Sequence, residues 1–246
     1  MQILLTVAYD GTNYAGWQRQ DNAIAVQQKI EESLSTMLAR PVSVVAASRT
    51  DAGVHALGQR VCFTAPDLQV PINKLPIVLV GLLPSDISVT AAEIVPDSFN
   101  PRFDAQHKTY EYSFYNAPYP NPILARYSAF VPQKININNM HKAAQFFIGK
   151  HDFAAFCATG SSAKTTVREI YACAVEEKPG NIMSLTITGN AFLYNMVRII
   201  AGTVLYVGLE KLTHNDIPDI IKSKDRTRAG KTMPPHGLVL KNITYS

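Results

Sequence analysis

The sequence is poor in cysteine, and its cysteines are not arranged for a disulfide framework or a zinc site. Cys62, Cys157 and Cys173 lie far apart and form no Cys-x-x-Cys pair. An odd, scattered set of this kind argues against both disulfides and structural zinc. All three stand in apolar or strand-like contexts, which is typical of buried free thiols. We therefore expect a protein of the cytoplasm, where thiols stay reduced.

A membrane span and a secretory leader are also missing. The apolar start of the chain has no basic region before it, is short, and ends at Asp10. The longest apolar stretch, residues 191–208, contains Asn195 and Arg198, whereas a spanning helix needs about 20 predominantly apolar residues. We expect neither membrane insertion nor secretion.

Metal and cofactor motifs are absent as well. The six histidines never stand at metal-ligand spacing. Residues 160–165 resemble a phosphate-binding loop, but Ala163 replaces the glycine required before Lys164. Asp10-Gly11-Thr12 resembles part of a phosphate-transfer motif whose nucleophilic aspartate would fall at Ala8. The sequence therefore predicts no metal and no cofactor.

The sequence does contain enough apolar residues for a sizeable core and an uneven distribution of charge. It has 246 residues, of which 47% are hydrophobic and 17% charged, as in ordinary globular proteins. Residues 1–100 carry a net charge of −3 and residues 101–246 a net charge of +7. The basic second part fits a polyanionic partner, although a solvated basic surface explains the charge equally well.

Hydrophobic periodicity predicts an α+β protein with two ferredoxin-like halves, 1–104 and 105–246. In the first half we expect an antiparallel sheet with helices on one face, and the second half repeats this pattern. The expected strands of the first half are 2–9, 42–47, 59–64 and 87–95, and its helices are 25–38 and 72–83. The expected strands of the second half are 107–115, 167–177, 182–188 and 238–243, and its helices are 138–148, 191–207 and 215–223.

One carboxylate stands out among groups that bind anions. Asp51 lies in a predicted loop and is flanked by Arg49, Thr50 and His55. An aspartate before Ala-Gly is often only a turn residue whose side chain accepts local backbone N–H groups. The concentration of cationic and polar neighbours is unusual for a simple turn. Asp51 is therefore a candidate catalytic residue.

A second candidate is Arg198, on a predicted helix that is apolar almost all round and so is expected to be buried. It shares a narrow polar stripe with Asn195. A buried guanidinium needs an anionic partner. Asp51 is one such partner, and Asp104 or Glu169 would serve as well.

Two further features have both a structural and a functional interpretation. Tyr110 lies on a predicted strand that also carries Tyr112, so it is either a core residue or a platform on which a base stacks. The cations from Lys222 to Lys231 form either a solvated surface or a set of phosphate contacts.

Several motifs together resemble the bacterial tRNA pseudouridine synthase A family, in family order and over essentially the whole chain. The RTDAGVHA element is the most specific. The matching stretches are 9–18, 49–56, 102–112, 189–198 and 234–238. Ser48, Asn100-Pro101 and Asn195 depart from the family pattern, and none of these departures removes a group that the chemistry requires.

The resemblance implies an isomerase that converts uridine to pseudouridine at positions 38–40 of the tRNA anticodon arm. Asp51 would be the nucleophile, Tyr110 would stack on the flipped uracil, and Arg198 would hold Asp51 ionised. The substrate-binding residues that the resemblance implies are Tyr110, Arg198, Leu193, Arg49, His55 and Arg102. It further implies a homodimer, a tRNA partner, no cofactor, and two antiparallel sheets that join into a central one flanked by helices.

Two other functions are compatible with parts of the sequence. A non-catalytic RNA-binding module with the same fold would bind RNA without turnover, but it would leave the Asp51 loop unexplained. A hydrolase acting on a phosphorylated metabolite would need a metal-binding cluster of acids, which the sequence lacks.

Overall fold

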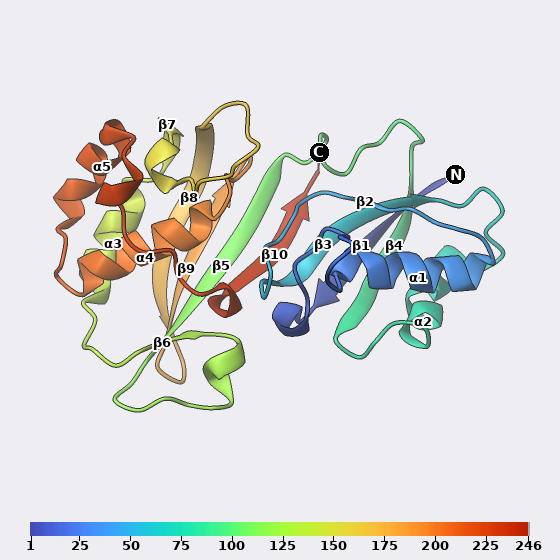
Figure 1. Ribbon diagram of the computed structural model, residues 1–246, viewed down its shortest axis with the longest axis horizontal. Helices are drawn as coiled ribbons and strands as arrows, with labels where there is room; N and C mark the ends of the chain where they lie inside the picture. Colours follow the sequence, from blue (N-terminus) through green and yellow to red (C-terminus); the bar gives the residue numbers. More distant parts are fainter. Residues whose placement is uncertain (246) are drawn as a thin grey trace. The chain divides into compact units, whose positions relative to one another are not determined.

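The computed structural model describes residues 1–245, which form two compact units. Unit 1 comprises Met1–Gln106 together with the C-terminal segment from Leu240, and unit 2 comprises His107–Val239. The sequence led us to expect residues 105–246 as one half. The C-terminal segment from Leu240 instead falls in unit 1, where it lies beside a strand of that unit (Figure 1).

Unit 1 is built on a sheet in which the strand order is β4-β1-β3-β10, with β2 beside β3. Strand β1 runs antiparallel to both of its neighbours. Its side chains Ile3, Leu5 and Val7 are fully buried, as the alternation in the sequence predicts. The strands are β1 (Gln2–Tyr9), β2 (Val45–Ala46), β3 (His55–Thr64), β4 (Ile87–Val95) and β10 (Leu238–Thr244).

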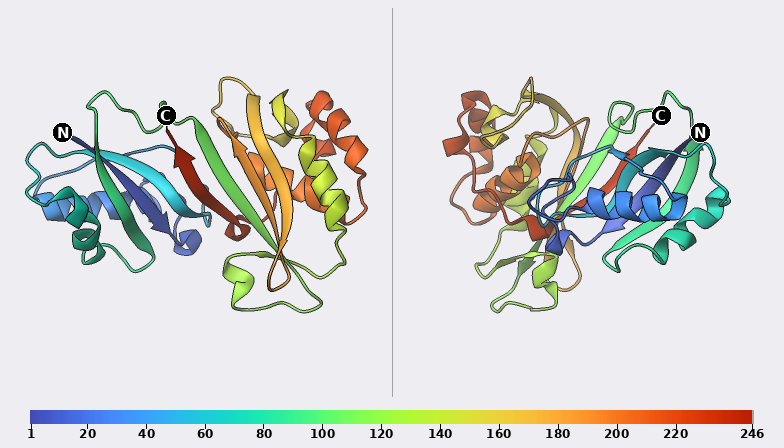
Figure 2. Two further views of the ribbon diagram at one scale, coloured as in Figure 1. Left: turned by 180° about the vertical axis from the view of Figure 1, so that it is seen from behind. Right: turned by 45° about the vertical axis from the view of Figure 1, so that its right-hand side comes forward.

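Helices α1 (Val26–Leu38) and α2 (Leu75–Val80) cover one face of this sheet (Figure 2). Helix α1 buries Val26, Ile30 and Leu34, a spacing that repeats with the helical period. It ends where Ala39 adopts the left-handed conformation, at φ 50°. Helix α2 is shorter than the expected 72–83, since its first turn is a 3-10 helix and Pro84 follows soon after Val80.

In unit 2 the strand order is β5-β9-β8-β7, with β6 parallel to β5. Strands β8 and β9 form a long hairpin whose turn contains Gly180 and Asn181, both at positive φ. The short strands β6 and β7 carry too few residues to show a periodicity, and the sequence did not reveal them. The strands are β5 (His107–Asn116), β6 (Ala129–Val131), β7 (Gly149–Asp152), β8 (Val167–Lys178) and β9 (Ile182–Gly189).

Three helices accompany this sheet: α3 (Ile137–Gln145), α4 (Met196–Gly208) and α5 (Ile217–Ser223). Helix α3 contacts both β8 and α4, and α4 is buried almost all round, as expected. The expected start of α4 at residue 191 is wrong. The helix begins five residues later, because its N-cap residue Asn195 is in the left-handed conformation, at φ 60°.

The α+β class is confirmed, with mainly antiparallel strand pairing and helices packed beside the strands. No helix within residues 1–245 has both the length and the apolar character needed to cross a membrane.

Candidate active site

Asp51 lies in a tight turn just before β3. Val54 donates its backbone N–H to the carbonyl of Asp51 at 3.1 Å, and Gly53 provides the positive φ of 77° that closes the turn. Thr50 is buried, whereas Asp51 is only partly buried. The turn therefore fixes the backbone on both sides of Asp51 while part of the residue remains accessible.

A second segment of unit 1, residues 10–17, holds this turn through its backbone. The N–H of Trp17 donates to the carbonyl of Thr50 at 3.0 Å, and the N–H of Gly53 donates to the carbonyl of Tyr14 at 3.3 Å. The carbonyls of Gly16 and Trp17 in turn accept from the first amides of α1. Two motifs that are separate in the sequence are thus joined into one hydrogen-bonded structure.

The two segments approach so closely that only glycine fits at two positions. A Cβ atom on Gly11 would lie 2.0 Å from the carbonyl oxygen of Val54. A Cβ atom on Gly16 would lie 2.6 Å from the carbonyl oxygen of Thr50, and Gly16 has a φ of +92°. These contacts give a physical reason for the glycines of the DGTNYAGW stretch.

Side chains of unit 1 complete the support of the turn. The hydroxyls of Tyr9 and Thr50 are hydrogen-bonded at 2.7 Å. Gln59, with no exposed surface, donates to the carbonyl of Ser48 at 2.7 Å and accepts from its amide at 3.3 Å. Tyr14 donates to Asp86 at 2.6 Å, and burial together with this carboxylate raises the pKa of the Tyr14 phenol, so the phenol remains a donor.

His55 is the first residue of β3 rather than a loop residue, and only 4% of it is exposed. Its Nδ1 atom accepts a hydrogen bond from the amide of Gly11 at 3.0 Å. A side chain so enclosed is better suited to joining the 10–17 segment to the turn than to meeting an RNA phosphate at the surface.

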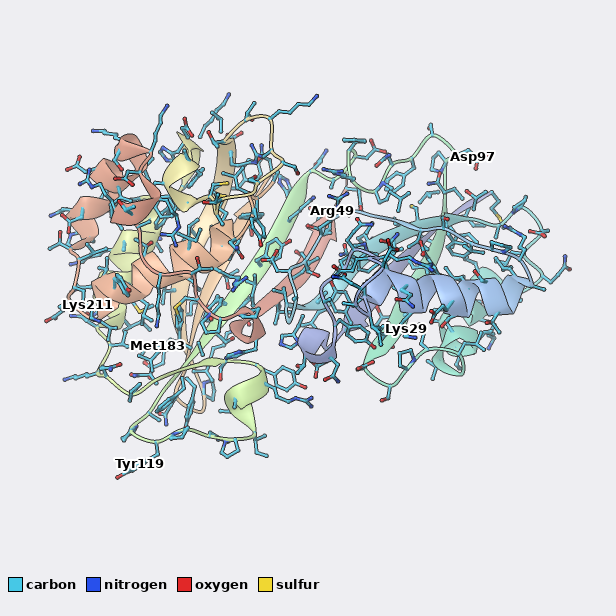
Figure 3. The ribbon with its side chains drawn as sticks, in the orientation of Figure 1. Lys29, Arg49, Asp97, Tyr119, Met183 and Lys211 are labelled. Atoms are coloured by element: carbon cyan, nitrogen blue, oxygen red, sulfur yellow. The ribbon has the colours of Figure 1, made fainter. Side chains whose placement is uncertain are left out.

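Arg49 and Arg102 are both exposed residues of unit 1. Arg49 comes from the segment between β2 and β3, immediately before Thr50 (Figure 3). Arg102 comes from the turn between β4 and β5. Exposed guanidinium groups on ordered turns are the groups expected to meet phosphates.

Unit 2 holds Arg198 by contacts with main chain and side chain. Its Nε donates to the carbonyl of Met233 at 2.7 Å, and its Nη1 donates to Oδ1 of Asn195 at 2.6 Å. The expected polar pair with Asn195 is therefore present, although Asn195 caps the helix instead of lying within it. Arg198 itself is partly buried, on a helix that is otherwise buried almost all round.

Tyr110 and Leu193 are both buried residues of unit 2. The ring of Tyr110 meets that of Phe192 edge to face, with centroids 5.1 Å apart. The neighbouring Tyr112 is fully buried and donates to the carbonyl of Pro234 at 2.8 Å. Burial raises the pKa of the Tyr112 phenol. Tyr112 therefore anchors the 234–238 stretch.

The basic segment 222–231 is partly used inside unit 2. The guanidinium of Arg226 donates to the carbonyl of Gly230 at 2.9 Å and to the hydroxyl of Thr232 at 3.1 Å. Lys224 is paired with Asp152 at 2.8 Å, which lowers the pKa of that carboxyl. These two cations stabilise the segment itself, which reduces the number available to a polyanion.

Gln59 is the supporting residue that the sequence analysis missed. A glutamine inside the otherwise apolar β3 is the signal that identifies such a residue, because a buried amide must be hydrogen-bonded. Within residues 1–245, no three His, Cys, Asp or Glu side chains gather in a way that could hold a metal ion.

Comparison with known proteins identifies the family of the chain. A family model described as tRNA pseudouridine synthase matches residues 5–104 and 143–246. The chain belongs to the tRNA pseudouridine synthase family. Pseudouridine synthases are isomerases, so the chain is a member of a family of enzymes.

Relatives in this tRNA pseudouridine synthase family match along their whole length. A tRNA pseudouridine synthase A of Ruminiclostridium cellulolyticum is 48% identical over 244 residues, which cover 99% of each chain. One of Caldicellulosiruptor saccharolyticus is 44% identical over 243 residues, again covering 99% of each. Among solved structures, a Cbf5-Nop10-Gar1 complex matches with a TM-score of 0.36 at 11% identity, covering 83% of this chain and 44% of that one.

Proposed function

We propose that this chain converts uridine to pseudouridine at positions 38–40 of the tRNA anticodon stem-loop, with Asp51 as its nucleophile. The observation that carries the proposal is the double fixation of the Asp51 turn. Trp17 and Tyr14 bind it through the backbone, and Gln59 holds Ser48, three positions before the aspartate. A carboxylate held in this way is preorganised for attack.

The reaction is an isomerisation, and it balances without a cofactor. The Asp51 carboxylate attacks either C1′ of the ribose or C6 of the uracil. The N1–C1′ bond breaks, the uracil turns in place, and C5 bonds to C1′. The proton leaves C5, N1 gains a proton, and the aspartate is released unchanged.

Unit 2 supplies the other groups of the proposal. We assign to Tyr110 the stacking on the uracil and a part in removing the C5 proton. Arg198, with two of its nitrogens already bound to Met233 and Asn195, has a fixed guanidinium plane with which to orient Asp51 and keep it ionised. Leu193 adds an apolar contact for the base.

The exposed cations of unit 1 are assigned to the RNA backbone. Flipping a uridine costs a few kcal/mol of stacking, so the extruded state needs stabilising contacts. Arg49 and Arg102 suit this task because both are exposed. His55 is assigned to positioning the Asp51 turn. We further propose that the enzyme acts in the cytoplasm as a homodimer.

The test is incubation of the purified protein with unmodified tRNA that carries uridines at positions 38–40. Pseudouridine is read from carbodiimide-dependent stops in primer extension, with Asp51→Asn in parallel. Stops with the wild type alone support both the reaction and the nucleophile. Tight tRNA binding without stops from either protein would leave an RNA-binding module of the same fold. Stops at other uridines would overturn the assigned positions.

A further inference from the structure

One aromatic side chain of unit 1 is held in solvent by a well-ordered turn. Phe103 is 77% exposed, and it lies in the segment between β4 and β5. A single exposed apolar residue needs no explanation by itself. Two features distinguish Phe103: the hydrogen bonds within the turn that carries it, and the cation next to its ring.

Asn100 organises the turn that presents Phe103. Its side-chain oxygen accepts from the amides of Arg102 at 3.0 Å and Phe103 at 3.3 Å. Its carbonyl accepts from the amides of Phe103 at 3.2 Å and Asp104 at 3.0 Å, and its own amide donates to the Asp104 carboxylate at 2.8 Å. The carboxylate of Asp104, the residue after Phe103, is therefore hydrogen-bonded within the turn.

The base of the turn is anchored in unit 1. Pro101 is buried, and its carbonyl accepts a hydrogen bond from Tyr245 at 2.9 Å. The ring of Tyr245 also meets that of Phe99, with centroids 4.9 Å apart. The backbone that leads into Phe103 is therefore anchored to the C-terminal segment of unit 1.

A guanidinium accompanies the ring. The central carbon of the Arg102 guanidinium lies 5.8 Å from the centroid of Phe103, within the range of a cation–π contact. An exposed aromatic ring next to a cation is the combination that binds unpaired nucleotides, because the ring stacks on a base and the cation meets the phosphate. A cation beside the ring favours a polyanion as the partner.

We propose that Phe103 is a stacking platform for an unpaired base of the RNA substrate, with Arg102 contacting the adjoining phosphate. The inference rests on the proposed function, because it takes RNA as the ligand. It adds a residue outside the Asp51 turn that selects RNA with an unstacked base, as found in a loop or at a flipped position.

The experiment measures binding of unmodified tRNA by fluorescence anisotropy over a series of KCl concentrations, in full-length protein that carries Asp51→Asn. Phe103→Ala is expected to weaken binding by roughly fivefold to a hundredfold, without changing the slope of log Kd against log salt. Phe103→Trp should restore binding. Arg102→Gln should lower the slope by about one phosphate contact.

The matched control is Ile77→Ala, which removes another apolar side chain of unit 1 that is 71% exposed. Its binding should stay within twofold of the parent, and an equal loss from both substitutions would overturn the inference. The inference would also be overturned if Phe103→Ala bound tRNA within twofold of the parent. A change in molar mass by light scattering that accounts for the weakened binding would assign Phe103 to a protein interface instead.

The wild-type assay separates this inference from the proposed function. If the wild type forms pseudouridine and Phe103→Ala binds tRNA normally, only the stacking platform fails. If the wild type forms none, the proposed function fails. The binding series still reports whether Phe103 stacks on RNA.

Discussion

In unit 1, the Nδ1 atom of His55 accepts a hydrogen bond from the backbone amide of Gly11 at 3.0 Å. The same nitrogen lies 3.1 Å from Oδ1 of Asp10, which already accepts from Thr12. A ring nitrogen either accepts or donates. Because the direction of the Gly11 amide is fixed by the backbone, Nδ1 accepts, and the proton of the ring is assigned to Nε2. The contact with Asp10 is then not an ion pair.

Replacing His55 tests this link between the 10–17 segment and the Asp51 turn. His55→Ala should lower the free energy of unfolding by about 2–4 kcal/mol, through a buried cavity and an unsatisfied amide. His55→Asn places an oxygen near the position of Nδ1 and should recover part of the loss. Urea denaturation gives both values. Equal losses from Ala and Asn would show that the hydrogen bond to Gly11 contributes nothing.

Gln59 should act on catalysis through the backbone of Ser48. Gln59→Leu keeps most of the side-chain volume but leaves the amide and the carbonyl of Ser48 without their partner, at about 1–3 kcal/mol each. A displaced Asp51 turn should reduce kcat by roughly tenfold to a hundredfold, while KM for tRNA changes little. Steady-state kinetics separate the two constants. A rise in KM at unchanged kcat would mean that Gln59 supports binding of RNA instead.

Gly11→Ala should disturb the same turn by steric conflict, since its Cβ would lie 2.0 Å from the carbonyl oxygen of Val54. We expect a loss of about 1–3 kcal/mol or more in stability and severely reduced activity. Gly81→Ala is the matched control, because its Cβ would meet nothing closer than 3.7 Å and its φ is −75°. That substitution should be neutral or slightly stabilising in thermal melts. Similar losses at both positions would contradict the role of the close contact.

Arg198→Lys should be far from conservative. One ammonium group cannot reproduce the two contacts that Nε and Nη1 make with Met233 and Asn195. Single-turnover rates should fall by roughly a hundredfold or more, with a loss of about 1–2 kcal/mol in stability. Asn195→Gly is the companion variant. It keeps the positive φ and removes only the side-chain acceptor, so its rate should fall less. Near-normal activity of Arg198→Lys would remove Arg198 from the proposed site.

The cysteines predict which thiols can be labelled in the native protein and how the stability of the protein depends on pH. Burial raises the pKa of Cys62 and Cys173 to about 12, whereas Cys157 is only partly buried. In the native protein at pH 8, one thiol should react with a disulfide reagent, and all three should react in denaturant. The folded-state pKa values lie above the ordinary thiol value of 9.0, which holds in the unfolded chain. Their contribution to stability is therefore complete below pH 9 and is lost between pH 9 and 12. Rapid native labelling of all three thiols would refute the assignment of two buried ones.

Much of the fold follows from the sequence because its long strands alternate clearly. Strands β1 and β4 begin and end as predicted, since turn residues and prolines bound them. The predicted start of α4 was wrong for a local reason. The apolar run from Ala191 continues the helical pattern, but nothing in it shows that Asn195 takes a left-handed conformation. The short strand β7 has no periodicity, and only its pairing with β8 defines it.

The candidate site was predictable by residue type more than by arrangement. The groups around Asp51 stand together in the sequence, so the turn was found. The backbone bonds from Trp17 and Tyr14 join segments more than thirty residues apart, and no local pattern encodes such pairs. His55 illustrates the limit. A histidine side chain can bind a phosphate, and only the fold shows that the Nδ1 atom of this one accepts a hydrogen bond from the backbone amide of Gly11.

Strand β10 makes unit 2 an insertion within unit 1, since the chain leaves unit 1 at Gln106 and returns to it at Leu240. During synthesis, at about 5–20 residues per second, the ribosome must therefore deliver unit 2 before β10, the neighbour of β3 on the side away from β1, is complete. The contacts that support the Asp51 turn come from Tyr9, Tyr14, Trp17 and Gln59, all of which precede unit 2 in the chain. A nascent chain can therefore carry a finished Asp51 turn on an unfinished sheet, in which β3 lacks its partner β10 until the insertion has been made.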